Sequence, residues 1–529
     1  MSKPFTNLRY LSALAALSFT LNIAHAAPAI QQGIQFGDVS DGHAMVWSRS
    51  DQASRMMIEY AYNSEFNNSV KVTGPYATAE SDFTAKQDLT GLLAGKDVYV
   101  KVWFEDLTNE RNVGEAVIGN FHTIGKNENI RFVWGGDVGG QGWGINKEFG
   151  GMKIFETMRQ VEPQFFIQSG DSVYSDGPIK ESVVAPNGQI WNNIVTPEVS
   201  KVAETLNEFR GRYKYNLLDD NLRRFNAEVP QIWQWDDHEV ANNWSDSKDL
   251  YGDSRYVVKD VPLLVSYAAQ AFHEYAPLRP HTADEPMRIY RKVSYGKLLD
   301  VFVLDMRSYR GPNTANMQPV EGPDTAFLGE VQVNWLKREL KASKATWKVI
   351  SADMPIALNV SDDYVNNPPQ KWEAVANGND GPAAGRELEI ARVLKFIKQK
   401  HIENIVWLTA DVHYAAAHYF NPEKAATDEF TPFWEFVSGP LNAGSFGPNS
   451  IDGTFGPEVV FSKAPPAGKS NLSPYAGLQF FGEVNIDKHS KAMKVDLKDI
   501  DGKTVYSKTL KAKKSKHHEN EHRKENYQD

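Results

Sequence analysis

Short apolar runs that end at a carboxylate recur six times along this chain. Each run has the length of a buried strand, and segments with helical spacing separate most of them. In open α/β sheets, side chains at the carboxyl ends of parallel strands gather in one crevice. The pattern therefore predicts an α/β fold with clustered carboxylates. The runs end at Asp137, Asp171, Asp237, Asp305, Asp353 and Asp411.

Helical periodicity appears between these runs. Apolar side chains recur three and four positions apart over Met152–Glu162, Glu330–Ser343 and Arg386–His401, which predicts one amphipathic helix in each range. A segment with proline and asparagine turns, Asp176–Asn207, follows one carboxylate motif directly. Because loops in that position often border a site, we expect it to form a lid or a wall for substrate.

The first part of the chain alternates apolar and polar positions and is rich in turns, which predicts a small all-β sandwich of the fibronectin III or immunoglobulin type. We expect this domain at residues 27–124 and a catalytic domain at 130–510 that ends in β hairpins. The sandwich strands are predicted at His43–Arg49, Met56–Tyr62, Asp97–Phe104 and Ala116–Ile124.

Both ends of the chain have their own composition. Residues 1–26 combine Lys3 and Arg9, an apolar stretch and the small-x-small sequence Ala24-His25-Ala26, which is typical of a secretory signal peptide. We therefore expect export to the periplasm or the outside. Residues 511–529 are charged and lack apolar positions, which predicts a disordered tail. No segment has the roughly 20 apolar residues of a membrane span.

Composition narrows the chemistry. The chain has no cysteine, so the available metal ligands are Asp, Asn, Tyr and His, which favour Ca, Mg, Mn, Fe(III) or Zn. A formal net charge of −10 argues against a nucleic-acid-binding surface. Several carboxylates in one crevice repel each other unless cations lie between them. These observations together indicate a hydrolase with more than one metal ion.

Four motifs resemble the calcineurin-like metallophosphoesterases, and most closely their alkaline phosphatase D family. They are GDSVY at Gly170–Tyr174, WDDHEVANN at Trp235–Asn243, LDMRSYR at Leu304–Arg310 and ADVHYAA at Ala410–Ala416. The resemblance implies a four-layer α/β/β/α catalytic sandwich after the all-β domain. The chain departs from it at Asp137, where many members have a cysteine.

The resemblance also implies the first metal site. Asp171 matches the aspartate that bridges two metals. Asp137, Tyr174 and His413 match ligands of the first metal, which the tyrosine ligand identifies as Fe(III).

A second metal site is implied by further matches. Asp237 and Asp411 stand where related enzymes have an asparagine and a histidine, and two carboxylates suit calcium. Zn²⁺, Mn²⁺ or Mg²⁺ are alternatives there. Asp353 lies near another ligand position of the family. A further calcium would be completed by Asp236, Asn242 or Asn243.

Two residues are candidates for direct contact with substrate. His238 directly follows Asp237 and is placed to touch the phosphate or to protonate the leaving group; a structural imidazole between carboxylates is the alternative. Arg307 lies just beyond Asp305, where a guanidinium can bind phosphate with two hydrogen bonds. Its alternative is an ion pair with Asp305 or Asp237 that only shapes the site.

The function that these expectations favour is an exported, metal-dependent alkaline phosphatase. Water activated by the metals would attack phosphorus in phosphomonoesters, and also in phosphodiesters. One alternative is a dedicated extracellular phosphodiesterase acting on nucleic acid or lipid headgroups. A more remote alternative is a calcium-binding surface protein without catalysis, although that predicts carboxylates in repeated loops, not beside His238 and His413.

Overall fold

The computed structural model describes residues 26–185, 187–282, 284–362 and 370–513. The predicted signal peptide, up to residue 25, and residues 514–529 of the predicted tail lie outside the described residues. Among the helices of the described ranges, none combines the length and the apolar character that a membrane crossing requires.

Two large sheets form the centre of the molecule, with nine strands in the first and seven in the second over the described residues. The first sheet has the order β22 (Thr504–Leu510), β21 (Met493–Asp499), β20 (Phe480–Ile486), β8 (Ile130–Gly135), β9 (Phe165–Ser169), β12 (Gln231–Gln234), β1 (Ile30–Ser40), β2 (His43–Ser50) and β5 (Thr84–Thr90). The second has the order β13 (Arg291–Tyr295), β14 (Leu299–Val303), β15 (Trp347–Ser351), β16 (Ile405–Thr409), β18 (Phe433–Val437), β17 (Ala415–Phe420) and β19 (Pro457–Lys463).

The central strands are apolar on both faces because each sheet is covered on both sides. Along β8, Phe132 and Trp134 face the second sheet, whereas Val133 faces helices. Along β14, Val301 packs between the sheets and Phe302 packs on the opposite side. Alternating residues of one strand therefore enter different cores, as the period of two in a strand requires.

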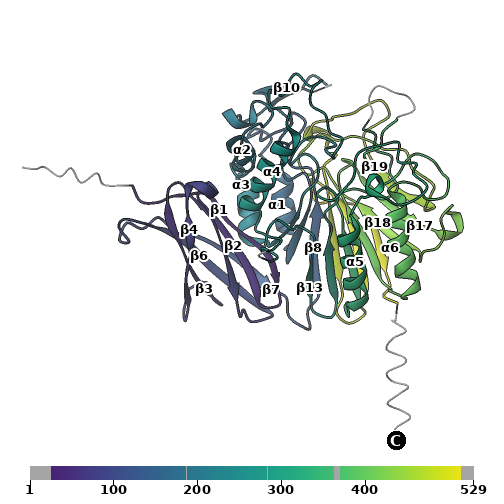
Figure 1. The fold of residues 1–529 in the computed structure, drawn as a ribbon. Helices are drawn as coiled ribbons and strands as arrows, with labels where there is room; N and C mark the ends of the chain where they lie inside the picture. The colour runs from purple at the N-terminus through teal and green to yellow at the C-terminus, as the bar shows by residue number, and fades with distance from the viewer. Residues whose placement is uncertain (1–25, 186, 283, 363–369, 514–529) are drawn as a thin grey trace, which may run out of the picture.

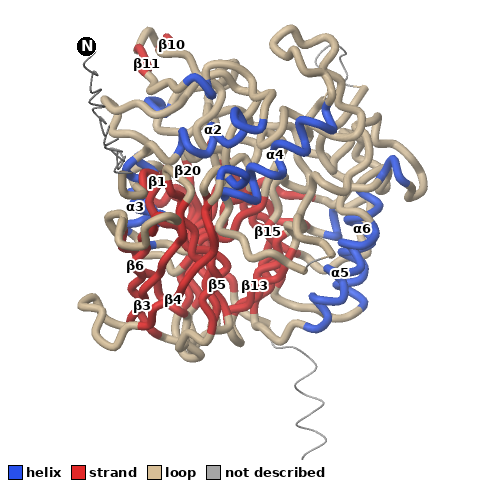
Figure 2. The backbone as a smooth tube through the Cα atoms, turned by 60° about the vertical axis from the view of Figure 1, so that its left-hand side comes forward, coloured by secondary structure: helices blue, strands red, loops and turns tan. Residues whose placement is uncertain are grey.

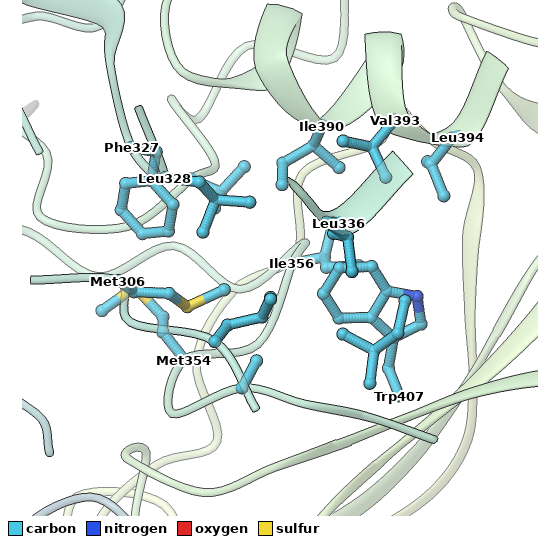
Figure 3. Packing of buried hydrophobic residues seen from close by; sticks show 14 of the residues in the cluster. Met306, Phe327, Leu328, Leu336, Met354, Ile356, Ile390, Val393, Leu394 and Trp407 are labelled. Carbon is cyan, nitrogen blue, oxygen red and sulfur yellow. The ribbon is translucent and has the colours of Figure 1, made fainter. Parts of the chain in front are cut away.

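Helices cover the outer face of each sheet. Side chains of α1 (Lys153–Gln160) and α3 (Asp220–Glu228) share a core with the first sheet. Side chains of α5 (Glu330–Ala342) and α6 (Glu387–Gln399) share a core with the second, around Trp407 and Leu336 (Figure 3). Helix, sheet, sheet and helix thus follow one another across the molecule (Figure 1), which confirms the predicted four-layer architecture.

Phe302 offers a test of this layering. Phe302→Ala is expected to destabilise the fold by about 3–5 kcal/mol, because it removes a fully buried ring and leaves a cavity under α5. The change is measured as a shift of the urea unfolding midpoint. Val331→Ala is the control, since Val331 lies on α5 but is 69% exposed, and it should change stability by no more than about 0.5 kcal/mol.

The N-terminal β region shares a sheet with the rest of the chain. Four strands, β4 (Val70–Ala77), β3 (Ser54–Ala61), β6 (Lys96–Asp106) and β7 (Val117–Thr123), form one layer, and β1, β2 and β5 form the other. β1 also pairs in parallel with β12, where Gly37 lies opposite Gln231. The all-β region predicted from the sequence is present, and its second layer continues into the first central sheet.

Three helices and one hairpin were not specifically predicted from the sequence. They are α2 (Leu206–Asn216), α3, α4 (Val261–Tyr275), and the hairpin β10 (Ser182–Val184) with β11 (Ile190–Asn192) inside the Asp176–Asn207 segment. Figure 2 shows β10 and β11 at the end of the molecule where many of the loops gather.

Candidate active site

Five parallel strands of the two central sheets end next to one another, and each is followed by an acidic residue that the sequence singled out. The pairs are β8 with Asp137, β9 with Asp171, β12 with Asp237, β15 with Asp353, and β16 with Asp411 and His413.

Several of these residues have a left-handed backbone. The φ angles are 67° at Asp137, 49° at Asp171, 65° at Asp411 and 61° at His413. Aspartate tolerates this region better than most residues, and backbone strain of this kind concentrates at functional sites. The chain therefore turns sharply after β8, β9 and β16, which brings these side chains toward one another.

The side chains form three overlapping clusters, in each of which one ligand atom per residue lies within 4.8 Å of the others. Asp171 belongs to two of them, and Asp237 also belongs to two. Such sharing is the arrangement expected of carboxylates that lie between neighbouring cations. The clusters are Asp137–Asp171–His413, Asp171–Asp237–His238 and Asp236–Asp237–Asp411.

Tyr174 and His413 face the first cluster. The Tyr174 hydroxyl lies 3.0 Å from His413 Nε2. His413 Nδ1 donates to the carbonyl oxygen of Gly444 at 2.5 Å, so the proton is on Nδ1. The unprotonated Nε2 lies 3.7 Å from Asp137 Oδ1. Burial lowers the pKa of His413 to about 4. The imidazole is therefore neutral and oriented as a metal ligand.

The carboxylates of the site lie close together, and several of their oxygens lack hydrogen-bond donors among the described residues. Burial, followed by the Asp236 carboxylate, raises the pKa of Asp137 well above its usual value, and burial with Asp237 does the same for Asp171. Among the described residues, both oxygens of Asp137 and of Asp353 lack a hydrogen-bond donor. Buried carboxylate oxygens without donors, together with one histidine and one tyrosine, fit hard cations such as Fe(III), Ca²⁺, Mn²⁺ or Mg²⁺.

Arg307 lies inside the protein among carboxylates. Its side chain has no exposed surface and forms ion pairs with Asp236 and Glu373, while its Nε lies 3.6 Å from Asp353 Oδ2. These contacts correspond to the ion-pair interpretation of Arg307, although the partners differ from the expected Asp305 and Asp237. Asp353 therefore lies beside the third cluster, next to Asp236, and not within any of the three.

Asp305 has a different role from the other strand-end carboxylates. Its oxygens accept hydrogen bonds from the Trp235 indole N–H at 3.1 Å, from the Arg307 backbone N–H at 3.0 Å and from the Ser308 hydroxyl at 2.6 Å. It closes the turn after β14 and stays outside the three clusters formed by the described residues.

His238 is held by Asp176. His238 Nδ1 and Asp176 Oδ1 are 2.6 Å apart, and His238 Nε2 faces Asp237 Oδ1 at 3.9 Å. Burial alone would lower the pKa of His238, but Asp176 and Asp237 raise this pKa to about 9. The same ion pair outweighs burial and lowers the pKa of Asp176 to about 2. This raised pKa favours the protonated imidazole at neutral pH.

A cleft of about 840 Å³ borders Tyr174 and His238 and runs along the Asp176–Asn207 segment. Its size is that of a small-molecule ligand site. Arg307, Asp353 and Glu373, by contrast, are at most 1% exposed. This cleft offers substrate an approach past Tyr174 and His238.

Three functional neighbours were not predicted from the sequence. Asp176 orients His238, and Glu373 pairs with Arg307. Glu239 accepts hydrogen bonds from the Ser172 backbone and hydroxyl, both at 2.6 Å, and from the Asp236 N–H at 2.9 Å, which ties two motif loops together. Only Glu239 had a local signal, because it lies within the WDDHEVANN motif.

Family models match most of the chain. The model described as PhoD-like phosphatase matches residues 132–497, and that described as PhoD-like phosphatase, N-terminal domain, matches residues 15–125. A curated relative, alkaline phosphatase D of Bacillus subtilis (strain 168), is 31% identical over 320 residues. This match covers 57% of the chain and 50% of that relative, so the chain spans about half of the relative's length.

Solved structures share the fold. The structure of PhoD has a TM-score of 0.66 at 20% identity, and the match covers 93% of this chain and 94% of that one. A purple acid phosphatase from yellow lupin (Lupinus luteus) seeds has a TM-score of 0.54 at 12% identity, covering 92% and 74%. Both likenesses extend over the all-β region as well as the two central sheets.

Proposed function

Because this chain belongs to the PhoD-like phosphatase family, we propose that it is an exported, metal-dependent alkaline phosphatase. It hydrolyses phosphomonoesters and, as a companion activity, phosphodiesters. The observation that carries this proposal is the position of Asp171, whose buried carboxylate belongs to two metal-ligand clusters beside an open cleft.

The cations would be held by the residues that form the clusters. Fe(III) fits the set with Tyr174 and His413, and Ca²⁺ fits the all-carboxylate set around Asp237, with Zn²⁺, Mn²⁺ or Mg²⁺ as alternatives. Two such cations, when bound, activate water near neutral pH and stabilise charge on a phosphoryl group. The proposed ligands are Asp137, Asp171, Tyr174, Asp236, Asp237, Asp411 and His413, with Asp353 beside them.

The chain's own groups would then handle the proton and the geometry. His238, protonated and fixed by Asp176, lies at the open side, where it can donate a proton to the leaving-group oxygen. Arg307 fixes Asp236 through its buried ion pair and lies beside Asp353, so it acts on the site through these carboxylates. Burial excludes bulk water from the inner face of the clusters.

A dedicated phosphodiesterase is the second candidate. The cleft continues from His238 along β10, which leaves room for a group on the far side of the phosphate. Aryl phosphate monoesters and diesters distinguish the two: a kcat/KM that is higher for the diester would move the assignment to the phosphodiesterase.

Metal analysis with a visible spectrum tests the proposal directly. The purified mature protein is expected to contain iron and calcium, to show a tyrosinate-to-Fe(III) charge-transfer band, and to lose monoesterase activity with a chelator. Tyr174→Phe should abolish the band. Tyr256→Phe is the matched control, because Tyr256 is also buried at the cleft but belongs to none of the clusters within the described residues.

Two results would contradict this assignment. If the protein had manganese- or zinc-dependent diesterase activity and no bound iron, the fold assignment would stand, and the function would be that of a dedicated phosphodiesterase. If the protein bound no metal and hydrolysed no substrate with any added metal, the assignment as an enzyme would be wrong.

A further inference from the structure

One wall of the cleft is built by the Asp176–Asn207 segment. Asn193 holds this wall, since its side-chain amide donates to the carbonyl oxygens of Gly142 at 2.9 Å and Lys180 at 2.7 Å. Its Oδ1 accepts from the Gly144 N–H at 2.8 Å. Gly142 and Lys180 both line the cleft. The wall is therefore fixed to the loop after β8, and its shape is preformed.

Most charges that line the cleft are already paired. Arg255 donates through its guanidinium to Asp253, with Nε 3.0 Å from Oδ1 and Nη2 2.7 Å from Oδ2. Asp176 is paired with His238, as described above. These two pairs account for the carboxylates among the residues that line the cleft.

Two lysines remain. Within the described part of the chain, neither Lys180 nor Lys248 forms an ion pair with a carboxylate. The Lys248 ammonium group donates to the carbonyl oxygen of Asn242, and the Asn242 N–H donates to Asp176 Oδ2 at 2.9 Å. This chain of contacts places Lys248 close to the partner of His238. The cleft thus carries two uncompensated positive charges beyond the metal-ligand clusters.

We propose that Lys180 and Lys248 bind a second anionic group of the substrate, so that the enzyme prefers phosphoric esters whose leaving group carries another phosphate. This inference rests on the proposed phosphatase function and specifies its substrate class. The apolar side chains of Val183, Leu250 and Phe446 line the same cleft and would contact the part of the leaving group between the two anions.

A tether series measures this preference. Alkane-α,ω-diol bisphosphates of increasing length are compared with alkyl monophosphates of the same length, and kcat/KM is expressed per phosphate. At the tether length that reaches the lysines, the bisphosphate is expected to be better by about tenfold, the factor that one charge-assisted hydrogen bond supplies. The preference should decrease as ionic strength rises, because both lysines border solvent.

Charge variants assign the preference to the two side chains. Lys180→Met and Lys248→Met should each reduce the ratio of bisphosphate to monophosphate kcat/KM, and Lys180→Glu should bring it below one. The matched control is the double variant Lys341→Met with Lys344→Met. Both lysines are exposed and lie before β15, at the opposite end of the sheet from the site. The control should keep the native ratio.

The outcomes separate this inference from the proposed function. If bisphosphates and monophosphates are hydrolysed equally at every tether length, the anion subsite is excluded and the phosphatase function stands. If neither is hydrolysed with any metal, the proposed function itself fails. An oligothymidylate with a 5′ phosphate, compared with thymidine 5′-monophosphate, shows whether a neighbouring phosphate in a polymer serves as the second anion.

Discussion

Asp171→Asn is expected to lower kcat/KM by roughly 10³-fold or more and to release metal from both neighbouring sites. Asp171 is 1% exposed, and its carboxylate is common to the first two clusters. An amide of the same size keeps the packing but removes the negative charge that two cations would share. Metal content and steady-state kinetics on an aryl phosphate, measured on the same preparation, check this result.

Asp305→Asn is the matched control for this prediction. Asp305 is equally buried and also follows a central strand, but its oxygens accept hydrogen bonds from Trp235, Arg307 and Ser308. Its variant should retain the metals and lose less than about tenfold in kcat/KM, with a modest loss of stability. If the Asp171 variant kept its full metal content, the bridging role would be wrong.

His238→Gln is expected to slow the hydrolysis of alkyl phosphates by about 10²–10⁴-fold, and that of p-nitrophenyl phosphate far less. An alkoxide leaves poorly unless it receives a proton, whereas p-nitrophenolate leaves without one. The carboxylates of Asp176 and Asp237 outweigh burial and raise the pKa of His238 to about 9, which favours the protonated imidazole. The measurement is kcat/KM over a series of leaving groups of increasing pKa.

In the Asp176→Asn variant, the loss of kcat/KM should also increase with the pKa of the leaving group, but by less than in the His238 variant. The reason is that the substitution removes the carboxylate that orients His238 and raises its pKa. Asp253→Asn provides the comparison. Asp253 lines the same cleft but pairs with Arg255, so its variant should not steepen the dependence on the leaving group. If the His238 variant lost the same factor in kcat/KM for every leaving group, proton donation by His238 would be excluded, and a structural role of this imidazole between carboxylates would be favoured.

The sequence predicted the central strands well because their signal is local. Each is a short run that is apolar on both faces, and β8, β14 and β16 were identified in this way. Helices α2 and α4 were not predicted, although α2 begins with a capping box at Thr205 and Glu208 and α4 with an Asp260 cap. Along α2 the buried positions include Arg212 and Asn216, so apolar periodicity is weak there. The buried positions of α4 recur at helical spacing, as in Leu264, Ala268 and Ala271, and this helix could have been predicted from the sequence.

The candidate site was predictable only where its residues follow a central strand. Residues just after a strand, such as Asp137 and Asp411, could be placed from the fold alone. Asp176 and Glu373 could not, because they lie in loops whose path depends on tertiary packing. The ion-pair partners of Arg307 were not predicted for the same reason, because its partner Glu373 lies far along the chain in a loop.

The pairing of β1 with β12 has a consequence for how such a protein can change over generations. Two family models divide the sequence near the Gly125–Asn129 segment, yet hydrogen bonds of the first sheet run across that division. A recombination event there that exchanged the β region would leave β12 with an unpaired edge, which invites aggregation. The two regions are therefore expected to be inherited as a pair, unless the incoming partner brings a strand that fits β12.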